Sequence, residues 1–133
     1  SSLPVVFPLH PRTRFRLDEF GLLDSLSQGI SIVEPLGYLD ILKLESEASL
    51  ILTDSGGMQK EAFFQRTPCV TIRSETEWTE LLPGGHNRLA RPGVDSIPEK
   101  AGEALAADPD WNVAFYGDGQ ASEIIARALG EAK

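Results

Sequence analysis

Short runs of apolar and β-branched residues recur along the chain, separated by longer segments in which polar residues dominate. Most of these runs show no alternation of apolar and polar positions, which is typical of strands that are covered on both faces. Five runs, each too short for a helix, predict strands: "PVVFPL" near Val5, "ISIV" at Ile30 to Val33, "LILT" at Leu50 to Thr53, "CVTI" at Cys69 to Ile72, and "RLA" at Arg88 to Ala90.

The segments between these runs place apolar residues at helical spacing. They are "LDEFGLLDSLS", "YLDILKLESEA", "GMQKEAFFQR", "ETEWTELL" and "SIPEKAGEALAAD", and a last amphipathic helix is expected over 120–129, after a turn at "GDG". Alternating strands and helices predict βαβ units with right-handed crossovers. The predicted fold class is therefore α/β, a Rossmann-like doubly wound parallel sheet of about five to six strands. Half of a β/α barrel is the competing interpretation.

Composition narrows the classes of function. At 133 residues the chain is predicted to form a single domain, 1–133, and its net charge of −8 argues against general binding to nucleic acid or anionic membranes. No apolar run approaches the roughly 20 residues that span a bilayer. The single cysteine, Cys69, excludes an internal disulfide, lies in an apolar run as a buried structural thiol would, and favours a cytoplasmic location. The opening "SSLP" lacks an initiator Met, from which we expect a piece of a longer protein.

Three loops should follow the carboxyl ends of predicted strands, where open α/β sheets bind their ligands. They are "LHPRTR", "TDSGG" and "IRSETEW". The first belongs to a basic segment that contains His10 and Arg12, and we interpret it as a loop facing an anion. A solvated loop or helix start is the alternative.

The letters "DSGG" also occur around serine nucleophiles, but a trypsin-like site needs an all-β double barrel. The phosphate interpretation fits better. Gly56 and Gly57 would let an anion approach the backbone closely. As glycines, they would also adopt backbone φ and ψ angles that other residues rarely reach. They open a predicted helix whose free N–H groups and dipole favour a pyrophosphate. Ser55 would donate to a phosphate oxygen, or serve only as the cap of the helix.

Glu61 lies one turn beyond Gly57, and helical side chains lean toward the N-terminus. Its carboxylate should point at the mouth of the same loop, where it would accept the two hydroxyls of a ribose. A pyrophosphate on glycines and a diol on a nearby acid together indicate a nucleotide. An ordinary surface glutamate is the alternative.

Six motifs in the same order, "HPRTR", "PLGYLDILKL", "ILTDSGGMQKEA", "TPCVTIRSETEWTELL", "GGHNRLA" and "YGDGQAS", resemble the C-terminal half of the non-hydrolysing UDP-N-acetylglucosamine 2-epimerases. The resemblance implies one half of a two-domain GT-B architecture, with this chain as the UDP-binding domain. It implies that Ser55 and Gly56 contact the diphosphate and that Glu61 holds the ribose. It also implies a binding or catalytic role for His10 and a phosphate or cleft contact for Arg73, with Arg12 in a variable part of the motif.

The family reaction eliminates UDP from a 2-acetamido sugar and adds it back with C2 inverted. The resemblance places the required carboxylates on a missing N-terminal domain, so the chain alone is expected to be inactive. We expect UDP or a UDP-2-acetamido sugar as ligand, no metal and no cofactor, and we leave a homodimer open. Many members read T-E-R-P-E where this chain has "TEWTE", so Trp78 stands in place of a cleft arginine. Related epimerases that act on diacetamido uronic acids are similar to this variant form, which leaves the exact sugar open. The alternatives are a GT-B glycosyltransferase donor domain and a non-catalytic regulatory or scaffold domain.

Overall fold

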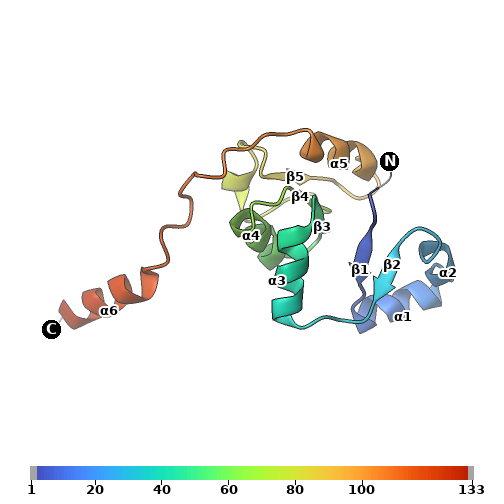
Figure 1. The fold of residues 1–133 in the computed structure, drawn as a ribbon, viewed down its shortest axis with the longest axis horizontal. Helices are drawn as coiled ribbons and strands as arrows, with labels where there is room; N and C mark the ends of the chain where they lie inside the picture. Colours follow the sequence, from blue (N-terminus) through green and yellow to red (C-terminus); the bar gives the residue numbers. More distant parts are fainter. Residues whose placement is uncertain (1–2, 132–133) are drawn as a thin grey trace. The chain divides into compact units, whose positions relative to one another are not determined.

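The computed structural model describes residues 3–131 (Figure 1). The chain forms two compact units, Ser1–Leu44 and Glu45–Lys133, and each is described here by itself. The elements run in the order β1 (Val6–Pro8), α1 (Pro11–Glu19), α2 (Leu23–Leu26), β2 (Ser31–Val33), α3 (Tyr38–Glu47), β3 (Ile51–Thr53), α4 (Gly56–Phe64), β4 (Cys69–Thr71), the 3₁₀ turn η1 (Thr79–Leu81), β5 (Asn87–Leu89), α5 (Ile97–Leu105) and α6 (Ala121–Glu131).

In the first unit, β1 and β2 pair in parallel, with Phe7 opposite Ile32. The basic segment after β1 is helical, so the expectation of a loop there is wrong. The Nδ1 atom of His10 accepts a hydrogen bond from the backbone N–H of Arg12 at 3.2 Å and caps α1, and Pro11 follows at the first helical position. The helix expected within 17–27 is divided instead between α1 and α2, because Gly21 adopts a φ of +63°.

In the second unit, three parallel strands pair in the order β3-β4-β5. The strand residues of β4 alternate between two cores. Cys69 packs with Ile51 and with Ala62 of α4, whereas Val70 packs on the other face with Ala90 and with Ala104 of α5. Helices α4 and α5 therefore cover opposite faces of this sheet (Figure 1). The covered parallel strands confirm the predicted α/β class.

All five predicted strands are present, but the predicted helix over "ETEWTELL" is reduced to η1. The hydroxyl of Thr76 accepts a hydrogen bond from the backbone N–H of Trp78 at 3.1 Å. A local side-chain acceptor of this kind competes with helical pairing. The segment before η1 is therefore a loop, and its side chains reach toward α4.

The turn before the last helix is confirmed, with φ of +74° at Gly117 and +85° at Gly119. The helix α6 that follows has no buried residue. Its apolar side chains Ile124, Ile125 and Leu129 are all exposed. Within residues 3–131 no helix combines the length and the apolar character needed to cross a membrane.

Candidate functional site

The first turn of α4 is built as the sequence predicts. Ser55 has extended backbone angles, and its hydroxyl oxygen accepts a long hydrogen bond from the backbone N–H of Met58 at 3.5 Å. The amides of Gly56 and Gly57 come before the helical pairing pattern begins, so they have no partner within the helix. Capping leaves the Ser55 hydroxyl hydrogen available as a donor. The cap and a phosphate contact are therefore compatible roles for one side chain.

The two glycines differ in what surrounds them. Both have ordinary helical geometry, because neither is among the residues with positive φ, so the expectation of special backbone angles is wrong. A Cβ atom on Gly56 would overlap the carboxylate of Glu77. A Cβ atom on Gly57 would meet only the hydroxyl of Ser55, at 3.9 Å. The flexible end of the Glu77 side chain thus lies over Gly56, whereas the space over Gly57 is open for a ligand.

The loop after β4 meets the start of α4, as the topology predicts. The indole Nε1–H of Trp78 donates a hydrogen bond of 2.8 Å to the carbonyl oxygen of Gly56. An Nη1 atom of Arg73 lies 3.1 Å from an oxygen of Glu77, the residue whose carboxylate covers Gly56. A guanidinium group is therefore held close to the amide end of α4.

A buried polar network supports this turn from below. Gln59, which is 1% exposed, donates from Nε2 to the carbonyl oxygen of Ser55 at 3.3 Å. Its Oε1 atom accepts from the hydroxyl of Thr76 at 2.5 Å and from Nδ2 of Asn87 at 2.9 Å. The hydroxyl of Thr71 donates to Oδ1 of Asn87 at 2.9 Å. This network was not predicted from the sequence, because buried polar residues in an α/β core produce no periodic pattern of apolar and polar positions.

Thr53 completes the turn. Its hydroxyl accepts a hydrogen bond from the backbone N–H of Ser55 at 3.0 Å. Thr53 is buried at the end of β3, and nothing in the sequence marks it for this role. The strand end thus fixes the residue that caps α4.

A lysine of α4 lies between two aromatic rings. The Nζ atom of Lys60 is 4.4 Å from the centre of the Trp78 ring and 4.3 Å from that of Tyr116. The Tyr116 hydroxyl donates to Glu80 at 2.7 Å. The pKa of Glu80 is lowered, first by its own backbone N–H and then by Tyr116. These contacts attach the Trp78 loop and the segment before α6 to α4.

Glu61 lies on α4, half-buried, one turn beyond Gly57 as expected. Its charge acts on a second carboxyl, that of Glu45 on α3. Glu45 is 4% exposed, and neither of its carboxyl oxygens has a hydrogen-bond partner. Burial, with a smaller contribution from the charge of Glu61, raises the pKa of Glu45 to about 7.

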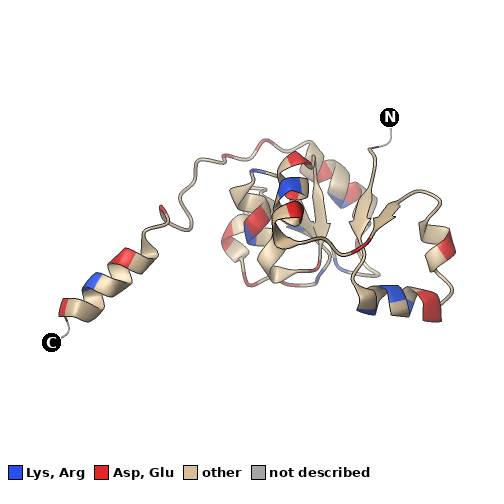
Figure 2. Ribbon diagram, turned by 60° about the horizontal axis from the view of Figure 1, so that its bottom comes forward, with Lys and Arg blue, Asp and Glu red and all other residues tan. Residues whose placement is uncertain are grey.

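His10 and Arg12 belong to the first unit, and their side chains are exposed. Because Nδ1 of His10 accepts the capping hydrogen bond, the neutral ring carries its proton on Nε2. The other arginines of this segment are paired with acids: Arg14 with Glu34 at 2.8 Å and Arg16 with Glu19 at 2.6 Å. Figure 2 shows both signs of charge along α1. That this segment and the α4 turn share one site stays a prediction.

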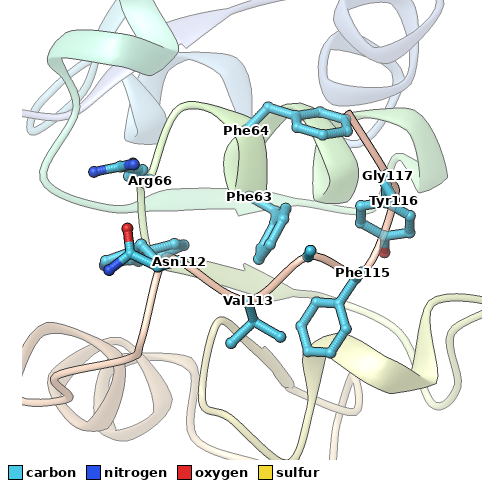
Figure 3. Close-up of a pocket in the computed structure, with 10 residues that line it drawn as sticks. Phe63, Phe64, Arg66, Asn112, Val113, Phe115, Tyr116 and Gly117 are labelled. Carbon is cyan, nitrogen blue, oxygen red and sulfur yellow. The ribbon is translucent and has the colours of Figure 1, made fainter. Parts of the chain in front are cut away.

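A cavity of about 370 Å³ opens at the other end of α4 (Figure 3). Its walls are aromatic and come from the end of α4 and from 111–117: Phe63, Phe64, Trp111, Phe115 and Tyr116. His86 packs edge-on against Phe63 and is buried, with Nε2 at 2.9 Å from the carbonyl oxygen of Asp110. The free amides of α4 lie at the opposite end of the helix, so this cavity is separate from the predicted anion site.

Residues 1–130 match the family model described as UDP-N-acetylglucosamine 2-epimerase. The chain is 45% identical over 126 residues to UDP-2,3-diacetamido-2,3-dideoxy-D-glucuronate 2-epimerase of Pseudomonas aeruginosa, covering 95% of this chain and 34% of the relative. It is 44% identical over 132 residues to UDP-N-acetylglucosamine 2-epimerase of Methanococcus maripaludis, covering 97% and 36%.

Among solved structures, the chain is similar to Methanocaldococcus jannaschii UDP-GlcNAc 2-epimerase in complex with UDP-GlcNAc and UDP. The TM-score is 0.85 at 41% identity, and the match covers 96% of this chain and 36% of the other. The chain thus spans about a third of the length of the relatives that it matches.

Proposed function

Because the chain belongs to the UDP-N-acetylglucosamine 2-epimerase family, we propose that it binds the UDP part of a UDP-2-acetamido sugar for a C2 epimerisation. The observation that carries the proposal is the first turn of α4. There the two glycine amides, the Ser55 hydroxyl and the nearby Arg73 guanidinium provide donors and positive charge for a diphosphate. Gly57 leaves room for the anion to reach the backbone.

Glu61 holds the ribose in this proposal. It projects from the helix that binds the diphosphate, and a carboxylate accepts two hydroxyl hydrogens of a diol. His10 and Arg12 are assigned to the diphosphate and the sugar, and the Nε2–H of His10 would be the donor available to the departing UDP. The negative charge that develops on UDP as it leaves is stabilised by these donors and by the α4 dipole.

The complete enzyme eliminates UDP and adds it back with the C2 centre inverted, so that the C2 proton returns to the face opposite to the one it left. Removal of the weakly acidic C2 proton needs a positioned base. We assign that base to the part of the protein outside this chain, an N-terminal domain of a GT-B architecture, and expect this chain alone to show no turnover of UDP-GlcNAc in a coupled assay. We also assign the protein to the cytoplasm. We further propose a homodimer, in which the exposed apolar side chains of α6 would be covered.

The sugar is a second part of the proposal. The two relatives above are named for different substrates, one with a single acetamido group and one with two and a uronate. Trp78 stands where many members of the family have a cleft arginine, and its N–H is engaged with Gly56. We propose the diacetamido uronate class as the preferred substrate. Competition between UDP-GlcNAc and the diacetamido uronate for the complete enzyme tests this choice.

Calorimetric titration of the chain with UDP and with 2′-deoxy-UDP tests the binding proposal. Glu61→Gln should weaken UDP binding about tenfold, because a charged acceptor to the diol is lost. Deleting the 2′-hydroxyl should cost a similar amount, and the two losses should not add, because both remove one contact. Additive losses would place Glu61 away from the ribose. No binding at about millimolar UDP would favour a scaffold that has lost its ligand.

A further inference from the structure

Glu45 is an anomaly in the second unit. Its side chain is 4% exposed, and both carboxyl oxygens are buried with no hydrogen-bond partner. Burying an isolated carboxylate is so costly that such a group takes up a proton instead. A buried carboxyl with no hydrogen-bond partner lowers the stability of the fold in both its neutral and its ionised form. This raises the question of what Glu45 does.

The position of Glu45 relates it to α4. Its backbone carbonyl accepts the hydroxyl of Thr67 at 3.0 Å, and the backbone N–H of Thr67 donates to the carbonyl of Ala62 at 2.9 Å. Ala62 directly follows Glu61. Thr67 therefore links the end of α3 to the turn of α4 that carries the proposed ribose ligand.

Two titratable groups face the Glu45 carboxyl from the elements packed against it. Glu61 of α4 acts on it as a like charge, and the buried thiol of Cys69 on β4 also interacts with it electrostatically. Burial raises the pKa of Cys69 to about 12, so this thiol remains neutral. On its own helix, Lys43 and Glu47 stand two residues away, and side chains at this spacing do not face each other. Glu61 is thus the charge to which Glu45 responds.

We propose that Glu45 is a positioning residue for Glu61: while its buried carboxyl is neutral the ribose-binding carboxylate is not repelled, and loss of the Glu45 proton weakens binding of the nucleotide. This inference rests on the proposed role of Glu61. An ionised Glu45 repels the Glu61 carboxylate in a poorly screened setting and also opposes the diphosphate.

Binding of UDP-GlcNAc to the chain between about pH 5.5 and pH 8.5 tests the proposal, since ionisation of Glu45 falls within this range. The two phosphates of this ligand are diesters and do not titrate there, unlike the terminal phosphate of UDP. We expect affinity to fall roughly threefold to tenfold as pH rises, as a nearby like charge dictates. Glu45→Gln should abolish this dependence and retain at high pH the affinity that the unsubstituted chain has at low pH.

Glu45→Met serves as a second variant, since it fills a similar volume without a proton and should show the same flat profile. Glu123→Gln, an exposed acid on α6, is the matched control and should keep the full pH dependence. Parallel profiles for the unsubstituted chain and Glu45→Gln would overturn the role of Glu45 while leaving nucleotide binding intact. No binding of UDP-GlcNAc at any pH would instead overturn the proposed function, and with it this inference.

Discussion

The indole Nε1–H of Trp78 donates a hydrogen bond of 2.8 Å to the carbonyl oxygen of Gly56, the first residue of α4. The contact joins the loop after β4 to the turn after β3. An indole N–H in this position orients the peptide plane that contains the Gly57 amide.

Trp78→Phe removes this donor and keeps an aromatic ring against Lys60. The loss should lower the free energy of unfolding by about 1 kcal/mol, the usual contribution of one hydrogen bond. UDP affinity should fall about twofold to fivefold, because the Gly57 amide is held less firmly. Calorimetry on this variant and on Trp111→Phe, which alters the other tryptophan, gives the comparison. Equal UDP affinity for the two variants would show that the Trp78 bond has no part in binding.

Gly57→Ala and Gly56→Ala separate ligand access from packing. Gly57→Ala should leave stability unchanged or raise it by up to about 1 kcal/mol through helix propensity. Its methyl group occupies the approach to the amides, so UDP affinity should fall about tenfold. Thermal unfolding and UDP titration of the variant measure both effects. Undiminished UDP binding by Gly57→Ala would mean that the anion does not reach this turn.

Gly56→Ala is the comparison. Its methyl group would overlap the Glu77 carboxylate, but this carboxylate is the end of a flexible side chain that is 49% exposed and can move aside. Unfolding free energy should therefore change by less than about 0.5 kcal/mol, and UDP affinity should fall less than in Gly57→Ala, because the methyl group faces Glu77 and not the open space over Gly57. A loss of stability above about 1 kcal/mol would mean that Glu77 cannot move aside.

Gln59→Met tests the buried network. The substitution leaves the Asn87 amide and the Thr76 hydroxyl without their acceptor, and it should cost about 2–4 kcal/mol of unfolding free energy. Urea denaturation measures the loss. Gln28→Met, at an exposed position, is the control and should change stability little. A loss at Gln59 as small as that at Gln28 would mean that the network does not stabilise the turn.

Glu45→Gln should change how stability depends on pH. The pKa of Glu45 is about 7 in the folded chain, raised from an ordinary value of 4.5 by burial and by Glu61. The penalty for ionising this buried acid is therefore absent below about pH 4.5 and grows as pH rises to about 7. Over this window the variant should gain about 3 kcal/mol relative to the unsubstituted chain. Denaturation at several pH values that shows a constant difference would contradict this assignment.

The sequence predicts the elements of this fold where local chemistry decides them. Short β-branched runs gave all five strands, and the Ser55 cap with its two glycines located α4. The limits of α1 were missed because His10 and Pro11 start the helix earlier than the apolar spacing suggests. The apolar spacing of the segment before η1 predicts a helix. The segment is a loop instead, because Trp78 bonds to Gly56 and Thr76 bonds to Gln59, and such tertiary contacts leave no periodic pattern in the sequence.

The candidate site follows the same division. Ser55, Gly56 and Arg73 meet at one turn because the topology brings strand ends to one edge. The residue that supports this turn from below could not be predicted, since Gln59 acts through its burial and through the partners Thr76 and Asn87, which are distant in sequence. The roles of His10, Arg12, Glu61 and Gly57 toward a nucleotide remain predictions.

The central claim is that a nucleotide diphosphate binds at the amide end of α4. Titration of the isotopically labelled chain with UDP, followed through its backbone amide signals by NMR, tests this most directly. The account predicts that the largest shifts occur at the amides of Gly56, Gly57 and Met58, and that they saturate together. Shifts concentrated instead at the aromatic cavity around Phe63 and Tyr116, or no shift in the first turn of α4 at saturating UDP, would contradict it.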